Sequence, residues 1–173
     1  DFENSLAAFL TGIKTKAYNG KSAPRVLLIS PIANENVKAV NAADLNNEQI
    51  QLYVDAMKKV ADQQNVGFVD AFGPLQQAMA SPGTDLTLNG CHLNAQGYAT
   101  FGVSLFSQAF GVSEATAKKY LSNSESLRAA ITDRNRQFTR RYRPVNTFYY
   151  TGARNKSYGY LDFLPAMRNF DVM

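Results

Sequence analysis

His92 is the only histidine in the chain of 173 residues, and it lies in the stretch "TDLTLNGCHLNAQGYATFG" at residues 84–102. Histidine is the side chain whose ordinary pKa is best suited to proton transfer near neutral pH. Asn89 and Asp85 lie close before it and could orient its ring. The pattern is typical of a general base, with a structural polar residue as the alternative. A general base of this kind needs a nucleophile to activate.

The only cysteine, Cys91, is the neighbour of His92. Adjacent residues in an extended segment point to opposite sides, so we expect a small packing role for the thiol and no Cys–His catalytic pair. A single cysteine excludes an internal disulfide and a cysteine-based zinc site. Phosphate-binding Gly motifs, paired His ligands and haem-attachment motifs are absent from the sequence, so no cofactor and no metal are predicted.

Helical and strand-like segments alternate along the chain, as is typical of α/β proteins. The spacing of apolar residues predicts helices over 2–18, 73–80 and 95–110, the last capped by Asn94, and one helix that Asn46 or Asn47 caps and that ends near residue 64. Two short apolar runs, at 25–30 and 66–70, predict strands, and the first is typical of a strand that is buried on both faces of a parallel sheet. A polar break is expected at 111–126, and a further helix from Leu127 with Leu127, Ile131, Phe138 and Tyr142 on one apolar stripe. Two strands make a poor sheet, so we expect additional strands before residue 1.

A polar loop, "PIANENVKAVNAADLNN", follows the first predicted strand. In open α/β sheets, the loops at the carboxyl ends of the strands build the ligand crevice. Asn34, Glu35 and Asn36 are therefore candidate substrate-binding residues. Loop capping and turn formation are an equally weighted alternative for these three side chains.

The charge is distributed unevenly. Residues 1–127 contain 9 basic and 11 acidic side chains, whereas residues 128–173 contain 9 and 3. Such a shift indicates a boundary, and we expect one domain at 1–111 and a basic, aromatic-rich helical or loop extension at 112–173. The arginines of the extension could bind anions, nucleic acid or an acidic polysaccharide. We favour a solvated helix face or a docking surface and predict no nucleic-acid partner, because no nucleic-acid-binding motif accompanies them. For the aromatic residues of the tail, packing is favoured over stacking on sugars.

The hydropathy of the chain and its N-terminal residues bear on two membrane-related features, a spanning helix and a signal peptide. No apolar run approaches the ~18–20 residues that a membrane-spanning helix needs, so no membrane span is predicted. The N-terminus lacks a basic region and a cleavage site, and it is not typical of a signal peptide. It is typical of a helix that is already under way, and we expect a processed or partial chain.

The stretch "LTLNGCHLNAQGY" resembles the last conserved block of SGNH (GDSL-type) hydrolases, in which Asp-x-x-His precedes the final helix. "PRVLLISPIANEN" and "NVGFVDAF" resemble upstream strands of that family, most closely of planctomycete and verrucomicrobial SGNH-type domains, which occur in larger multidomain bacterial proteins. The resemblance implies a flavodoxin-like three-layer α/β/α fold with a parallel sheet, which this chain contains only in part. It also implies an extracytoplasmic location.

The resemblance further implies a serine esterase that acts on acyl esters, with carbohydrate as the substrate class and His92 as the general base. Asn89 stands where most relatives have the orienting Asp, and an Asn can hold the imidazole but cannot stabilise the imidazolium charge. Asp85, a backbone carbonyl or a Ser–His dyad are alternatives, and we favour Asn89 as the orienting residue.

The family's blocks that carry the nucleophilic Ser and the oxyanion-hole Gly and Asn are not found in the sequence. We therefore expect the nucleophile to precede residue 1, and the sheet edge to be covered by the remainder of the parent protein or by another chain. The alternative to an esterase is a non-catalytic interaction or structural module on the same fold.

Overall fold

The computed structural model describes residues 1–38, 41–81, 83 and 85–142, and the chain divides into two compact units, Asp1–Leu121 and Ser122–Met173. The elements are α1 (Phe2–Lys14), β1 (Leu27–Ile29), α2 (Ala43–Gln64), β2 (Gly67–Val69), α3 (Phe72–Met79), α4 (Ala95–Phe110), α5 (Glu114–Ser122) and α6 (Glu125–Tyr142). Helix α6 belongs to the second unit, and the first unit holds the other elements up to Leu121 of α5.

Strands β1 and β2 form a parallel sheet, as the two apolar runs predict. Helix α2 is the crossover between them, which a parallel connection requires. In the described part of the chain the sheet has two strands, and Leu27 and Ile29 of β1 are 44% and 40% exposed. The prediction that this strand is buried on both faces is therefore wrong for the described residues, because Leu27 and Ile29 lie on the same face of β1 and that face is partly exposed.

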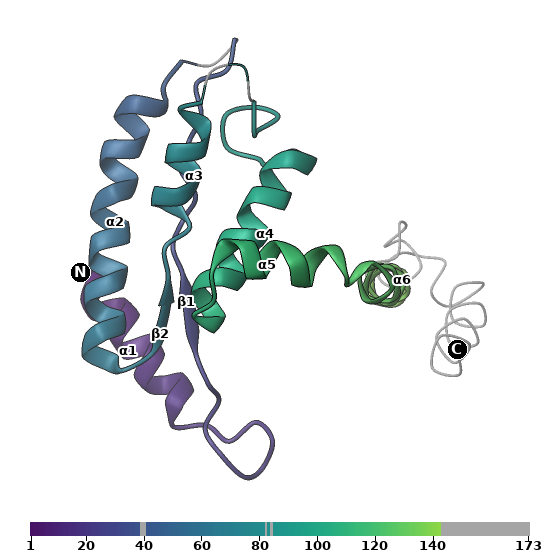
Figure 1. Cartoon of the computed structure of the whole chain (residues 1–173). Coiled ribbons are helices and arrows are strands. Elements are labelled where there is room, and N and C mark those ends of the chain that lie inside the picture. Colours follow the sequence, from purple (N-terminus) through teal and green to yellow (C-terminus); the bar gives the residue numbers. More distant parts are fainter. Residues whose placement is uncertain (39–40, 82, 84, 143–173) are drawn as a thin grey trace, which may run out of the picture. The chain divides into compact units, whose positions relative to one another are not determined.

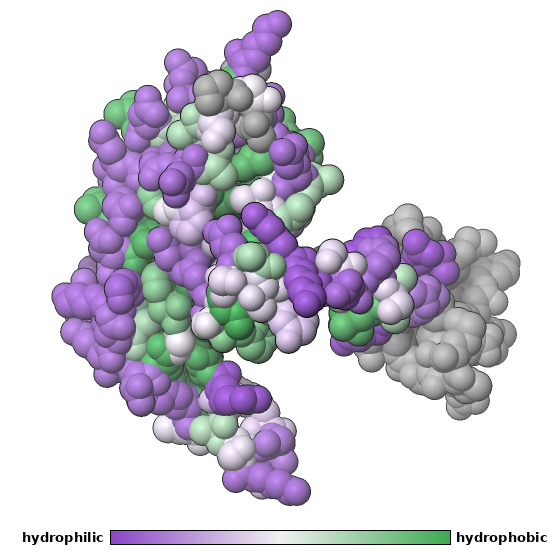
Figure 2. Space-filling model, in the orientation of Figure 1, coloured by the Kyte–Doolittle hydropathy of each residue, from purple (hydrophilic) through white to green (hydrophobic). Residues whose placement is uncertain are grey.

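Helices lie on two sides of the paired strands. Helix α2 contacts α1 and β2, and helix α4 contacts β2 and α3. Figure 1 shows α1 and α2 on one side of the strands and α4 on the other, and mostly hydrophilic side chains cover the outer side of α2 in Figure 2. Buried apolar residues form two clusters, one of Ala33, Val54 and Phe72 and one of Leu75, Leu86 and Leu93. The second cluster packs beneath the segment that carries His92.

Helix α4 has the bounds that the sequence predicts. The Asn94 side chain accepts a hydrogen bond from the Gly97 backbone N–H at 2.9 Å, which satisfies a donor of the first turn. Gly111 ends the helix with φ 63°, a left-handed conformation that glycine adopts without strain. Both signals are local in sequence, and the prediction is confirmed.

Helix α2 begins at Ala43, so the prediction that Asn46 or Asn47 caps it is wrong. Asn47 lies inside the helix and is buried, and its side-chain amide bonds the backbone of the loop that follows β1. Its Oδ1 accepts from the Asn34 N–H at 2.7 Å, and its Nδ2 donates to the Asn34 carbonyl at 2.9 Å. A tertiary contact therefore uses the amide that we expected at the cap.

Other bounds differ by a few residues. Helix α1 ends at Lys14, before Tyr18, because the Asn19 side chain accepts from the N–H groups of Lys21 and Ser22 and forms a turn. Helix α5 occupies part of the predicted polar break at 111–126, where the Ser113 hydroxyl accepts from the Thr116 N–H at 3.2 Å. This local cap stabilises helix α5, which the polar composition of the segment did not predict.

Helix α6 is an arginine-containing helix that begins at Glu125. Its Arg128 guanidinium donates to the Glu125 carboxylate, and this hydrogen bond lowers the pKa of Glu125 and raises that of Arg128. The apolar residues expected on one stripe, Leu127, Ile131 and Phe138, are exposed. The aromatic tail lies outside the described residues. Within the described part, no helix is long and apolar enough to cross a membrane.

Candidate functional site

His92 lies on a short hairpin formed by residues 86–94. The Leu88 N–H donates to the His92 carbonyl at 2.8 Å, the Asn94 N–H donates to the Leu86 carbonyl at 2.9 Å, and Thr87 pairs with Leu93 in an antiparallel bridge. Leu86 and Leu93 are buried and fix the base of the hairpin in the core. His92 is consequently held on the outer, solvent-exposed part of the hairpin.

Asn89 bonds the ring of His92. Asn89 Oδ1 lies 3.0 Å from His92 Nδ1, and the same oxygen accepts from the His92 backbone N–H at 3.0 Å. A backbone N–H can only donate, so the Asn89 atom that faces it is the oxygen and not the nitrogen of the amide. The Asp85 side chain is exposed, and its backbone carbonyl accepts from Asn94 Nδ2 at 2.7 Å. Of the orienting groups considered, Asn89 is the one that this geometry places against the ring.

The Asn89 contact fixes the tautomer of His92. Two acceptors that face each other at 3.0 Å would repel, so Nδ1 carries the proton and donates it to Asn89 Oδ1. Nε2 is then unprotonated in the neutral ring and presents a lone pair. A side chain that is exposed on a turn and holds a free imidazole nitrogen can act as a general base.

Cys91 lies closer to the imidazole than the sequence predicts. Its Sγ is 3.2 Å from His92 Nδ1, and it is 3.5 Å from Asn89 Oδ1. The expectation that Cys91 and His92 point to opposite sides is wrong, because residues 88–92 form a turn and not an extended segment. Gly90 adopts φ 88° at this turn. The thiol contacts Nδ1 and leaves Nε2 free.

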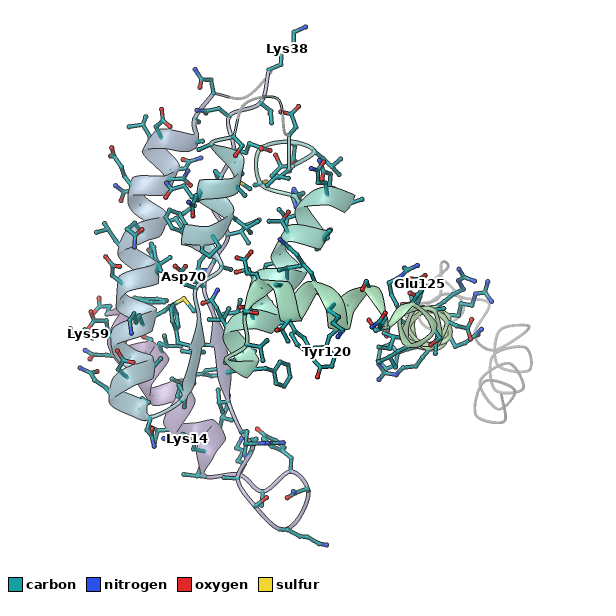
Figure 3. All side chains as sticks on the ribbon, in the orientation of Figure 1. Lys14, Lys38, Lys59, Asp70, Tyr120 and Glu125 are labelled. Atoms are coloured by element: carbon teal, nitrogen blue, oxygen red, sulfur yellow. The ribbon has the colours of Figure 1, made fainter. Side chains whose placement is uncertain are left out.

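Ser30 and Asp70 end the two strands and hold the start of α3. The buried Ser30 hydroxyl accepts from the N–H groups of Ala71 and Phe72 at 2.8 and 3.1 Å. Asp70 Oδ1 accepts from the Phe72 N–H at 2.9 Å, and Figure 3 shows Asp70 at this junction. The Ser30 hydroxyl therefore satisfies helix donors, which gives it a structural role.

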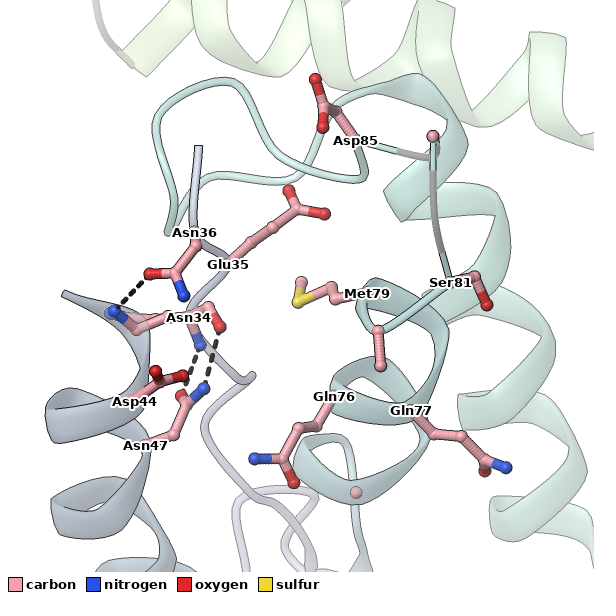
Figure 4. Close-up of a pocket in the computed structure, with 14 residues that line it drawn as sticks. Asn34, Glu35, Asn36, Asp44, Asn47, Gln76, Gln77, Met79, Ser81 and Asp85 are labelled. Carbon is pink, nitrogen blue, oxygen red and sulfur yellow. Dashed lines mark hydrogen bonds between the residues drawn. The ribbon is translucent and has the colours of Figure 1, made fainter. Parts of the chain in front are cut away.

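Glu35 is buried, and its carboxylate contacts the hairpin. The carboxylate accepts from the N–H groups of Leu86 and Thr87 and from the Thr87 hydroxyl. Figure 4 shows the Glu35 side chain extending toward the segment that carries Asp85. The partners are 51 and 52 residues away in sequence, so no local pattern could have revealed them.

The three predicted substrate-binding residues line one pocket. This pocket has a volume of about 710 Å³ and lies between the loop after β1, the start of α2 and the end of α3 (Figure 4). Its polar lining includes Asn34, Glu35, Asn36, Asp44, Asn47, Gln76, Gln77, Ser81 and Asp85. Within the lining, Asn36 Oδ1 accepts from the Ala43 N–H at 2.9 Å.

The predicted residues thus fall into two groups. His92 and Asn89 form one group on the hairpin, and neither lines the 710 Å³ pocket. Asn34, Glu35 and Asn36 form the other group, and the Glu35 N–H donates to the Gly90 carbonyl at 2.8 Å to connect the two. Asp44, Gln76 and Gln77 add polar side chains to the pocket that the sequence did not single out, because they lie on helices. Among the described residues, no group of three or more His, Cys, Asp or Glu could hold a metal ion.

A comparison with protein families gives a match to the GDSL-like lipase/acylhydrolase family over residues 1–100. The matched region includes both strands, the pocket and the hairpin with His92. A search of curated proteins finds no match. Because the family match covers more than half of the 173 residues, the chain belongs to the GDSL-like lipase/acylhydrolase family.

Proposed function

We propose that this chain is part of a serine ester hydrolase, that His92 is its general base and that Asn89 orients the base. The observation that supports this assignment is the 3.0 Å contact between Asn89 Oδ1 and His92 Nδ1, which favours the tautomer of the neutral ring that has its lone pair on Nε2. Membership of the acylhydrolase family supports the reaction class. The proposal includes a nucleophilic Ser outside residues 1–173, because the family's block with the nucleophilic Ser is not found in the sequence and the Ser30 hydroxyl accepts hydrogen bonds at the start of α3.

In the proposed reaction, Nε2 of His92 takes the proton of the serine hydroxyl while the serine oxygen bonds to the acyl carbon. The imidazolium then gives this proton to the departing alcohol, as the ester C–O bond breaks. A water molecule attacks the acyl-enzyme in the same way, with His92 again as the base, and releases the acid. Asn89 keeps the ring in the required tautomer, but its neutral amide stabilises the imidazolium less than a carboxylate would.

The pocket beside Asn34 and Asn36 is our candidate for the alcohol part of the ester. Its amides and carboxylates offer both donors and acceptors, and the described residues of its lining include no Lys or Arg. Such a lining suits a neutral ligand with many hydroxyl groups, and we propose a carbohydrate ester. The Glu35 carboxylate is occupied by the hairpin, so we expect the neighbouring amides to make the substrate contacts.

The family resemblance of "SPIANEN" and "LNGCHLN" supports further parts of the proposal. The chain would be the C-terminal part of a flavodoxin-like domain at 1–111, close to the planctomycete and verrucomicrobial type, with an extension at 112–173. A strand from the remainder of a larger bacterial protein, or from another chain, would pair with the second edge of β1, which among the described residues pairs with β2 alone. We keep the extracytoplasmic location as part of the same proposal.

The proposal is tested by labelling the complete gene product with a fluorophosphonate, which reacts with activated serines, and by mapping the modified residue. We expect one labelled Ser outside residues 1–173, and no labelling and no ester turnover by residues 1–173 alone. Labelling that disappears in the His92→Ala variant would support the base assignment. A complete protein that neither reacts nor hydrolyses esters would instead favour a non-catalytic module, for which the Asn at position 89 is the specific observation.

A further inference from the structure

The Glu35 carboxylate accepts hydrogen bonds from three different donor groups of the hairpin. Oε1 accepts from the Leu86 N–H at 2.9 Å, and Oε2 accepts from the same N–H at 3.1 Å. Oε2 also accepts from the Thr87 N–H at 2.7 Å and from the Thr87 hydroxyl at 2.5 Å. The residue is 6% exposed. Both oxygens of a buried carboxylate are therefore occupied by one strand of the hairpin.

The donor groups of Leu86 and Thr87 are all satisfied only by a side chain whose polar atoms are hydrogen-bond acceptors and not donors. An ionised carboxylate has two acceptor oxygens and no donor, whereas an amide has one oxygen and an NH₂ group. In either orientation, the NH₂ of a Gln at position 35 would face a Leu86 or Thr87 N–H. Buried donors that lose their acceptor are costly, and bonds to a charged acceptor are shorter and stronger than neutral ones.

The contact continues from Glu35 to the turn that carries Asn89 and His92. The Thr87 hydroxyl, which donates to Glu35, accepts from the Gly90 N–H at 3.0 Å. The Glu35 backbone N–H donates to the Gly90 carbonyl at 2.8 Å. A Cβ on Gly90 would lie 2.9 Å from the Glu35 carbonyl oxygen, so only glycine fits this approach. The Glu35 backbone N–H thus binds the Gly90 carbonyl directly, and the Glu35 carboxylate is linked to the Gly90 N–H through the Thr87 hydroxyl.

We propose that Glu35 is a positioning residue for His92: it holds the 86–94 hairpin in the shape in which Asn89 Oδ1 meets Nδ1. This inference rests on the proposed function for its catalytic consequence, but the geometry of the hairpin does not depend on that function. In this proposal the Glu35 carboxylate holds the hairpin and does not contact the substrate. Glu35 acts through Thr87 and Gly90 and does not touch the reacting atoms.

The test is Glu35→Gln, which keeps the size of the side chain and removes its second acceptor. Long-range ¹H–¹⁵N correlation spectra report which imidazole nitrogen carries the proton, and His92 is the only histidine of the chain, so its signals need no assignment. We expect an Nδ1–H ring in the wild type and a severalfold increase of the Nε2–H tautomer in the variant. The matched control is Glu48→Gln, which removes an exposed carboxylate from α2 and should leave the spectrum unchanged.

In the complete protein, Glu35→Gln should lower kcat for a p-nitrophenyl ester by about a hundredfold, more than loss of the Asn89 contact alone, because it displaces the hairpin and with it His92 itself, and small misplacements of a catalytic group have losses of this order. KM should stay within about twofold, since a positioning residue does not bind substrate. If Glu35→Gln does not fold, Thr87→Val replaces it, because this variant removes only the hydroxyl between Glu35 and Gly90. It should shift the tautomer in the same direction by a smaller amount.

Two results would overturn the inference. An unchanged Nδ1–H ring in a folded variant would show that Glu35 does not position His92. A higher KM with an unchanged kcat would assign the carboxylate to the substrate instead. A complete wild-type protein without ester turnover would contradict the proposed function, but the tautomer measurement would still decide the role of Glu35.

Discussion

Replacing Gly97 by alanine should destabilise the first unit and displace the hairpin that carries His92. Gly97 lies in the first turn of α4, where the helix meets the base of the hairpin. A Cβ at this position would lie 2.2 Å from the Leu86 carbonyl oxygen and 2.9 Å from Leu93 Cδ2. Ordinary contacts begin near 3.4 Å, so helix and hairpin would have to separate by roughly 1 Å. The Asn94 cap, which accepts from the Gly97 N–H, would be strained by the same movement.

The change in the free energy of unfolding of Gly97→Ala follows from two opposing effects. Overpacking of a core costs about 1–3 kcal/mol, and a clash with a backbone oxygen belongs at the upper end, near 3 kcal/mol. The higher helix propensity of alanine offsets about 1 kcal/mol of this. We therefore expect a net loss of about 2 kcal/mol, which for a chain of this size lowers the Tm by about 4–8 °C.

Gly102 provides the matched control on the same helix. A Cβ there would meet nothing within 4 Å, so Gly102→Ala should raise the free energy of unfolding by about 0.5–1 kcal/mol through helix propensity alone. Thermal unfolding followed by far-UV circular dichroism compares the two variants. Equal stabilisation by both substitutions would refute the packing of α4 against the hairpin, because it would show that position 97 has free space.

Substitutions at three further residues test the contacts around the site. Asn89→Ala should lower kcat of the complete protein about fivefold, in line with the loss of a neutral hydrogen bond of about 1 kcal/mol. Asn89→Asp should raise kcat because a carboxylate stabilises the imidazolium, and an inactive Asn89→Asp variant would argue against the base assignment. Ser30→Ala should lower the free energy of unfolding by about 1–3 kcal/mol, since it removes the hydroxyl that accepts from the N–H groups of Ala71 and Phe72, and denaturant titration measures this loss. Asn47→Ala should destabilise by a similar amount and weaken binding of a carbohydrate ester at the pocket, which KM would report; an unchanged stability would show that the Asn47–Asn34 bonds contribute nothing.

The sequence predicts best those features whose causes are local. The bounds of α4 follow from Asn94 before it and Gly111 after it, and both residues act within one turn of the helix. The Asn89–His92 contact spans three residues; the spacing offered both Asp85 and Asn89 as partners of the ring, and the family resemblance favoured Asn89. The parallel pairing of β1 and β2 follows from two apolar runs with a long helical segment between them.

Features that depend on distant partners could not be predicted in this way. Asn47 has the side chain of a good helix cap, but its amide bonds Asn34 and the helix begins four residues earlier. Glu35 was expected at the substrate, and its carboxylate bonds a hairpin more than 50 residues away. Cys91 contacts His92 because Gly90 turns the backbone, and an assumption of extended geometry hid that contact.

The most direct test of His92 as the general base is the ester hydrolysis rate of the complete protein with and without the His92 imidazole. Removal of one member of a serine–histidine pair lowers turnover by about a thousandfold or more. We therefore predict a loss of at least this order in kcat/KM for p-nitrophenyl acetate in His92→Ala, with an unchanged Tm because the side chain is exposed. A folded His92→Ala variant that hydrolyses the ester at the wild-type rate would contradict the assignment of His92 as the general base.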